Sequence, residues 1–156
     1  MTVNTYVDDS QRLLVYRYIG RIEMDEVINA ASTIAARADR NIEYRSLLVF
    51  DRTVALSELG PDELARIKQE LVEKYAKAGI RRSAGAIMVD GSMDARIIMP
   101  LWKALFDSDP AEDVDYKLFT NPEAALAWLD ARETEPLTEM FAPLDGRDRK
   151  SPEQAG

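Results

Sequence analysis

The sequence of 156 residues contains no histidine and no cysteine, and these absences exclude the commonest active-site chemistries. Without histidine the chain lacks the most frequent general base and cannot form a Ser-His-Asp triad. Without either residue it cannot hold zinc through the usual nitrogen and sulfur ligands, and thiolate catalysis and disulfides are also excluded. We therefore expect a protein that is not an enzyme and that has no cofactor.

Long apolar runs and positive charge are also scarce. No run of 18 apolar residues occurs, so we expect no stable membrane insertion. The first five residues lack the basic start and apolar stretch of a signal peptide, so we expect a cytoplasmic location. The formal net charge is −8 and no basic stripe is present, which argues against a nucleic-acid partner and against adhesion to anionic lipid.

The apolar fraction of 46% is typical of a globular chain, and the length fits one domain. Residues 3–7 and 13–19 read as strands joined by turn-forming residues, which predicts an antiparallel hairpin. Residues 46–50 and 84–89 form continuous apolar runs. Such runs are typical of strands that are buried on both faces, and they predict a largely parallel sheet covered by helices.

Three amphipathic helices are predicted between these strands. The first spans about residues 25–38, and the second opens at Gly60-Pro61 and ends at Gly79. The third starts near Ser92 and contains Pro100, which should kink it or break its hydrogen-bond ladder. A strand at 116–119 leads into a last helix, with Asn121 as the cap and Pro122 at the first helical position. The order β-β-α-β-α-β-α-β-α predicts an α/β fold with a five-stranded mixed sheet.

This element order, together with the closing segment Phe119-Thr-Asn-Pro-Glu-Ala-Ala-Leu-Ala-Trp-Leu129, resembles the SpoIIAA-like proteins of the STAS superfamily of sulfate-transporter and anti-sigma-factor-antagonist domains. The similarity covers roughly residues 3–131. It implies a compact domain with a five-stranded mixed sheet. It also implies a role in binding partner proteins or, in some branches of the superfamily, small molecules such as lipids or nucleotides.

The chain departs from the anti-sigma-factor antagonists at their phosphorylation motif. Those proteins carry an Asp-Ser-Ser-Gly-type tetrad leading into the helix after the third strand, and residues 51–62 contain no such tetrad. Counted without gaps, the acceptor position falls near Gly60, which has no hydroxyl. Thr53 and Ser57 are the nearby hydroxyl residues, but neither lies in the motif, so the resemblance does not carry the phosphorylation switch to this chain.

Polar side chains at two strand ends are the first candidate site. Asp51 and Asp90 follow adjacent parallel strands, where ligands of open α/β sheets bind. Arg52, Thr53, Ser92 and Arg96 could line the same rim. A ligand or Mg²⁺ could bind there; alternatively, each aspartate simply caps the amides of the following loop.

Apolar residues of the third helix are the second candidate site. Met99, Trp102 and Phe106 could line a groove for an amphipathic, lipid-like molecule or for a partner protein, with the polar rim orienting its head. Core packing or self-association in a homodimer is the other interpretation. The predicted function is accordingly a non-enzymatic binding or regulatory module. The alternative is a protein–protein regulator related to the anti-sigma-factor antagonists without their phosphorylatable serine.

The C-terminal stretch differs in composition from the rest of the chain. We place the domain at residues 1–132 and expect a mobile, acidic tail with three prolines at 133–156. Within it, Leu137, Met140, Phe141 and Leu144 fall at helical spacing. This segment could therefore dock on the domain or on another protomer.

Overall fold

The computed structural model describes residues 2–142. Its strands are β1 (Thr2–Asp8), β2 (Leu13–Ile19), β3 (Glu43–Phe50), β4 (Arg81–Val89) and β5 (Asp115–Phe119). Its helices are α1 (Met24–Arg37), α2 (Pro61–Ala78), α3 (Met93–Asp107), α4 (Pro122–Trp128) and α5 (Glu135–Phe141).

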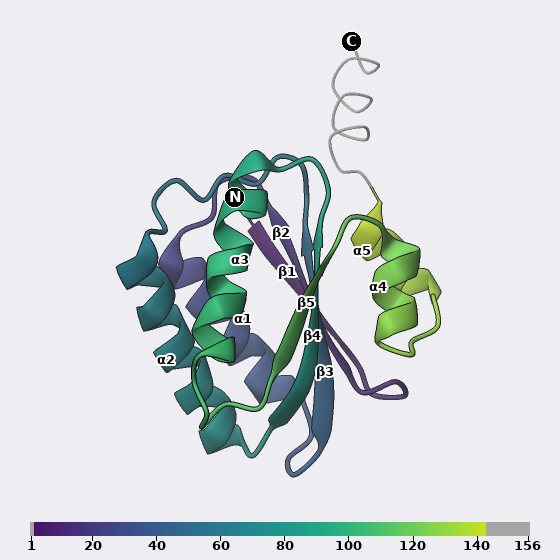
Figure 1. The fold of residues 1–156 in the computed structure, drawn as a ribbon. Helices are drawn as coiled ribbons and strands as arrows, with labels where there is room; N and C mark the ends of the chain where they lie inside the picture. The colour runs from purple at the N-terminus through teal and green to yellow at the C-terminus, as the bar shows by residue number, and fades with distance from the viewer. Residues whose placement is uncertain (1, 143–156) are drawn as a thin grey trace.

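The five strands form one sheet in the order β1-β2-β3-β4-β5 (Figure 1). β1 and β2 are antiparallel, and the pairs β2–β3, β3–β4 and β4–β5 are parallel. The predicted hairpin and the five-stranded mixed α/β sheet are therefore confirmed. β3 and β4 begin three residues before their apolar runs, because their first residues, some of them charged, also pair with each other through the backbone.

The helices form a layer on each face of the sheet (Figure 1). Each crossover from β2 to β5 steps in the same direction across the sheet. Because such crossovers are right-handed, α1, α2 and α3 must all lie on one face. The chain then leaves β5 and covers the opposite face with α4 and α5. The sheet consequently has two buried apolar layers, the larger one under α1–α3.

The helix ends follow the predicted signals. Asn121 Oδ1 accepts a hydrogen bond from Ala124 N at 2.8 Å, and Ser92 Oγ accepts one from Ala95 N at 3.1 Å. Gly79 ends α2 in the left-handed conformation with φ of 70°. α3 continues through Pro100, which lies on its exposed face and, as expected, removes one backbone donor from the hydrogen-bond ladder.

The beginning of the expected mobile tail is folded. Residues 135–141 form α5, which lies on the sheet face opposite α1–α3 (Figure 1). Leu137 is completely buried there, and Met140 and Phe141 pack against the same cluster. The docking interpretation of this segment therefore holds for these three residues, whereas Leu144 lies outside the described residues. The segment folds in spite of its acidic composition, because its apolar residues have helical spacing and Leu137 packs on an apolar surface formed by β2, β3 and β4.

Within residues 2–142, no helix combines the length and the apolar character that crossing a membrane requires.

Candidate functional site

The structure places two members of the predicted polar rim, Asp51 and Ser92, on opposite faces of the sheet. Asp51 points to the α5 face of the sheet, where its carboxylate pairs with Arg17. Ser92 lies on the other face and is 1% exposed, because its hydroxyl caps α3 and donates to Val54 O at 2.8 Å. Asp90, Arg52 and Arg96 are exposed. Among residues 2–142, no three acidic side chains cluster closely enough to hold a metal ion.

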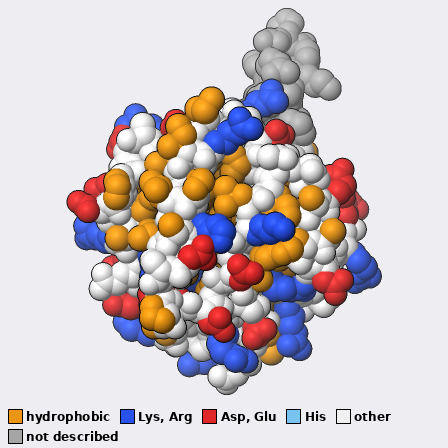
Figure 2. Space-filling model, in the orientation of Figure 1, with side chains coloured by type: hydrophobic (Ala, Val, Ile, Leu, Met, Phe, Trp, Pro, Cys, Tyr) orange, Lys and Arg blue, Asp and Glu red, His pale blue; other side chains and the backbone are white. Residues whose placement is uncertain are grey.

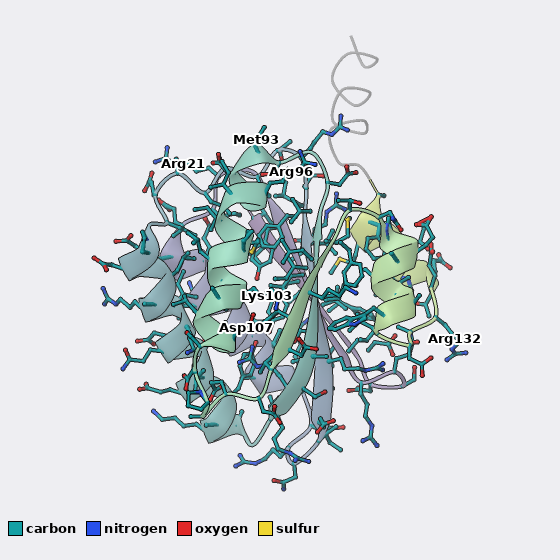
Figure 3. The ribbon with its side chains drawn as sticks, in the orientation of Figure 1. Arg21, Met93, Arg96, Lys103, Asp107 and Arg132 are labelled. Carbon is teal, nitrogen blue, oxygen red and sulfur yellow. The ribbon has the colours of Figure 1, made fainter. Side chains whose placement is uncertain are left out.

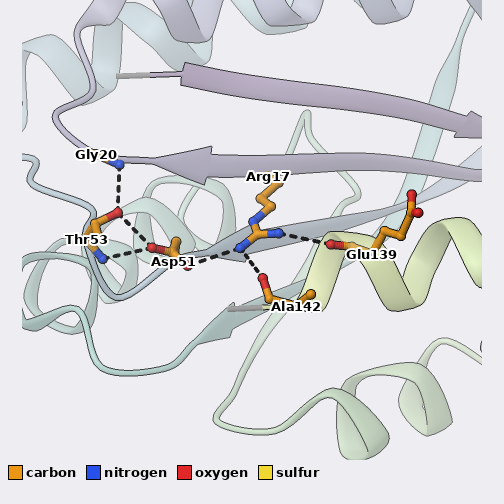
Figure 4. Close-up of polar contacts among 6 residues, drawn as sticks. All are labelled: Arg17, Gly20, Asp51, Thr53, Glu139 and Ala142. Atoms are coloured by element: carbon orange, nitrogen blue, oxygen red, sulfur yellow. Dashed lines mark hydrogen bonds and ion pairs between the residues drawn. The ribbon is translucent and has the colours of Figure 1, made fainter. Parts of the chain in front are cut away.

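Asp51 is the centre of a buried polar network (Figure 4). Arg17 Nη2 lies 3.1 Å from Asp51 Oδ1, and both side chains are about 5% exposed or less. Asp51 Oδ2 accepts from Thr53 N at 3.1 Å and from Thr53 Oγ1 at 2.7 Å. The Thr53 hydroxyl in turn accepts from Gly20 N at 3.0 Å. The hydroxyl of Thr53 thus both donates and accepts a hydrogen bond at the strand end.

Arg17 connects this network to α5. Its Nη1 donates to the carbonyl oxygen of Glu139 at 3.0 Å, and its Nη2 also donates to the carbonyl oxygen of Ala142 (Figure 4). These are carbonyls at the C-terminal end of α5, which attracts positive charge. The network is therefore a structural clamp between β2, β3 and α5.

The clamp predicts a pH dependence of stability. Burial by itself would raise the pKa of Asp51, but the hydrogen bonds from Thr53 and Arg17 outweigh it and hold the pKa below its usual value. A carboxylate with a lowered folded-state pKa stabilises the fold above its unfolded pKa of about 3.9, and this contribution is lost as the pH falls through the folded pKa.

We expect the free energy of unfolding, measured in urea at pH 7 and pH 3, to fall less in Asp51→Asn than in wild type. Replacing the exposed Glu73 with glutamine is the control for loss of one carboxylate. An equal fall in wild type and Asp51→Asn would show that Asp51 is not held in its charged form by the clamp.

The predicted apolar residues of α3 face inward. Met99 and Trp102 are each 5% exposed and Phe106 is 1% exposed, so they cannot form an outer groove. The outer-groove prediction is wrong because the buried stripe of α3 lies against the sheet, whereas its exposed large apolar residues are Met93, Ile97 and Leu101. Two of the three inward residues, Met99 and Trp102, instead line an internal cavity.

This cavity lies between the sheet and the helix layer. α1 packs on β1, and α3 packs on β4 and β5, whereas α2 packs mainly on those two helices. Large side chains fill the space between α2 and the centre of the sheet, and a cavity remains with room of about 40 Å³ for the centres of water-sized molecules. Its lining is mostly apolar and aromatic, and includes Tyr16, Tyr18, Phe50, Leu64, Ile67, Leu71 and Tyr116.

Two polar atoms that line the cavity have no partner. Ser46 Oγ and Trp102 Nε1 are buried and make no hydrogen bond within residues 2–142. Leaving a buried donor or acceptor unpaired costs roughly 1–3 kcal/mol. Buried polar atoms without a partner are rare in folded proteins. We expect a water molecule or a ligand to supply the missing hydrogen bond to each of them.

Two small residues, Ser46 and Gly85, are neighbours at the centre of the sheet, and Ser46 lines the cavity. A row of paired residues crosses the sheet from Leu14 through Ser46 and Gly85 to Tyr116. Of the two central positions, Ser46 carries only a hydroxymethyl group and Gly85 has no side chain. An added Cβ at Gly85 would overlap the Tyr116 ring, so the glycine allows this ring to lie across β4. The Tyr116 ring therefore occupies the space that a Val or Ile side chain would fill on a normal strand, and both Tyr116 and Ser46 line the cavity.

Of the described residues 2–142, one cation and no acid line the cavity. The Arg82 guanidinium lies 4.4 Å from the Tyr75 ring centre, and its Nη1 donates to Tyr116 Oη at 3.2 Å. The Tyr16 and Tyr75 hydroxyls are bonded to each other. Burial raises the pKa of Tyr18 and of Tyr75, so both phenols stay neutral at physiological pH. The lining therefore offers hydrogen-bond donors and suits acceptor-bearing, uncharged or anionic molecules.

Most residues of the cavity are absent from the predicted site. Ser46 interrupts the apolar face of its strand, and Gly85 stands inside another strand, where glycine often marks a close approach. Tyr16 and Tyr18 alternate along β2 and therefore share a face. These signals are present in the sequence, but only the register of β3 against β4 places Ser46 beside Gly85.

Comparison with known proteins adds no assignment. No family model matches the chain, and no curated protein and no solved structure is significantly similar to it.

Proposed function

We propose that this protein is a non-enzymatic binding module that holds a small, acceptor-bearing apolar molecule between its sheet and the helices α2 and α3. The observation that carries the proposal is the pair of unpartnered polar atoms, Ser46 Oγ and Trp102 Nε1, in one apolar cavity. Small-molecule sites are mostly apolar with a few converging polar groups that fix orientation. We also propose that the chain is related to the SpoIIAA-like proteins, because its element order and closing segment resemble theirs.

The size of the cavity limits which ligands it can hold without a change in conformation. Typical ligand pockets have volumes of roughly 300–1,000 Å³, far more than the space of about 40 Å³ here. The conformation described here thus has room for waters or for a very small ligand. A larger ligand has to separate α2 from the sheet, which disturbs the Tyr16–Tyr75 contact and the tether of Lys68 Nζ to Leu105 O at 3.0 Å.

The competing interpretation is a structural water that bonds to both polar atoms. Two variants separate it from a ligand. Ser46→Ala is nearly isosteric and removes one hydroxyl, whereas Trp102→Phe removes the indole nitrogen together with two ring carbons and also enlarges the cavity. In ligand-free protein we expect Ser46→Ala to raise the free energy of unfolding by about 1 kcal/mol, measured in urea, because it removes an unpaired hydroxyl. A loss of stability would indicate that a bound water already satisfies Ser46.

The ligand itself is tested by native mass spectrometry of the purified protein, followed by titration with benzoate and phenol as small acceptor-bearing aromatic probes. We expect either a bound mass that is released on denaturation or saturable probe binding, reduced about tenfold by each variant. The matched control is Ser57→Ala, which removes an exposed hydroxyl outside the cavity. A clean mass together with no probe binding would contradict the proposal.

A further inference from the structure

The outer face of α3 carries the exposed large apolar side chains of the described residues. Met93 is 64% exposed, Ile97 is 61% exposed and Leu101 is 44% exposed. They follow one another at four-residue spacing, so at about 100° per residue they lie within one narrow stripe along the helix. Figure 2 shows hydrophobic side chains gathered over α3 on the face of the molecule turned to the viewer. An apolar stripe of this kind on a protein surface marks an interaction site.

Charged residues border one side of this stripe. Arg96, Lys103 and Asp107 lie along the same flank of α3, and Figure 3 shows them on that side of the helix. Lys103 Nζ bonds to Asp107 Oδ2 at 2.7 Å. The guanidinium of Arg96 makes no hydrogen bond or ion pair with residues 2–142, and within the same range Asp107 Oδ1 is also unbonded. The flank is therefore positive near the start of α3 and has a free carboxylate oxygen near its end.

We propose that this face of α3 pairs with the same face of a second copy of the chain, with the two helices antiparallel. In an antiparallel pair related by a two-fold axis, equivalent flanks of the two helices face each other. A pairing centred near Leu101 puts each Arg96 opposite the partner's Asp107. In the same register Leu101 lies within one residue of its counterpart, and Ile97 lies level with the space between the partner's Ala104 and the partner's Ser108, so that a large side chain meets small ones.

The charges favour a second copy over the other occupants of an apolar stripe. A single register places each Arg96 guanidinium opposite the free carboxylate oxygen of the partner's Asp107. This is possible because the order of charges along the flank is reversed in the antiparallel partner. A membrane surface offers no such match, and the formal net charge of −8 opposes binding to anionic lipid. A pair of 15-residue helices, each about 22 Å long, makes a small interface, so we expect a dissociation constant in the micromolar range.

The test is sedimentation velocity of the full chain over concentrations from about 1 to 500 μM. We expect wild type to pass from monomer to dimer, and Ile97→Asp to weaken dimerisation about 100-fold, since it places a charge at the centre of the stripe. Arg96→Glu and Asp107→Arg should each weaken it about tenfold. The matched control, Arg66→Glu, reverses an exposed charge on α2 and should change nothing.

Mixing the two charge variants tests the antiparallel register. In a heterodimer of Arg96→Glu with Asp107→Arg, both cross-pairs again join opposite charges, so an equimolar mixture should recover near-wild-type affinity. Circular dichroism of each variant reports whether the fold is intact. A wild type that stays monomeric throughout would overturn the proposal, as would failure of the mixture to recover. Co-sedimentation with vesicles of 70% phosphatidylcholine and 30% phosphatidylglycerol, lost in Ile97→Asp, would assign the stripe to lipid instead.

Discussion

Replacing Arg17 with methionine should lower the free energy of unfolding by about 3–5 kcal/mol, because it leaves the carboxylate of Asp51 buried without its counter-ion. Methionine keeps much of the arginine stem, so the loss comes from the guanidinium rather than from an empty space. The same change removes the donors that bind the carbonyl oxygens of Glu139 and Ala142. The measurement is urea unfolding at pH 7, followed by far-UV circular dichroism.

Two further variants isolate the cause. Glu139→Ala should change stability by less than about 0.5 kcal/mol, because Arg17 bonds to the backbone of Glu139 and the side chain is exposed (Figure 4). Arg17→Met combined with Asp51→Leu should recover much of the loss, because a buried pair is often replaceable by apolar residues. If Arg17→Met costs under about 1 kcal/mol, or if the double variant is no better, the pair does not act as the clamp described above.

Replacing Leu137 with alanine should lower the free energy of unfolding by about 2–5 kcal/mol, because the side chain is 0% exposed and its removal leaves a cavity under α5. Thr138→Ala, at an exposed neighbouring position, is the comparison for helix propensity. The loss should appear in urea unfolding as a lower midpoint. A change below about 0.5 kcal/mol would mean that α5 contributes little to the folded state.

Hydrogen exchange extends this test to the whole helix. In wild type, the amides of the second half of α5 should be protected, because its C-terminal carbonyls are held by Arg17 and its apolar face is packed on the sheet. Leu137→Ala should increase exchange in α5 more than in β3, the central strand. Uniform change across the protein would instead indicate that α5 opens only with global unfolding.

The sequence identified some residues of the candidate site correctly and misplaced others. The sequence marked Trp102 and Met99 as apolar residues of a helix that could bind a ligand, and both line the cavity. It placed them on the wrong side of α3, because a broad apolar helix does not reveal which half of its surface meets the sheet. Asp51 was marked as a ligand residue, but its charge is already neutralised by Arg17. A single arginine within the apolar strand Leu13–Ile19 was the available sign of a buried partner.

The sequence alone determined the five strands, the helices α1 to α4, their order and the α/β class, whereas α5 was expected to be part of a mobile tail. Strand periods, apolar runs, Gly79, Asn121 and Pro122 act over a few residues, and one strand order with right-handed crossovers then fixes which helices share a face. The tertiary structure alone decided which distant groups meet. Ser46 lies beside Gly85 only through the register of β3 and β4, and Arg17 reaches α5 across a gap of more than 120 residues. Such contacts follow from burial and pairing geometry between segments, which local sequence patterns do not encode.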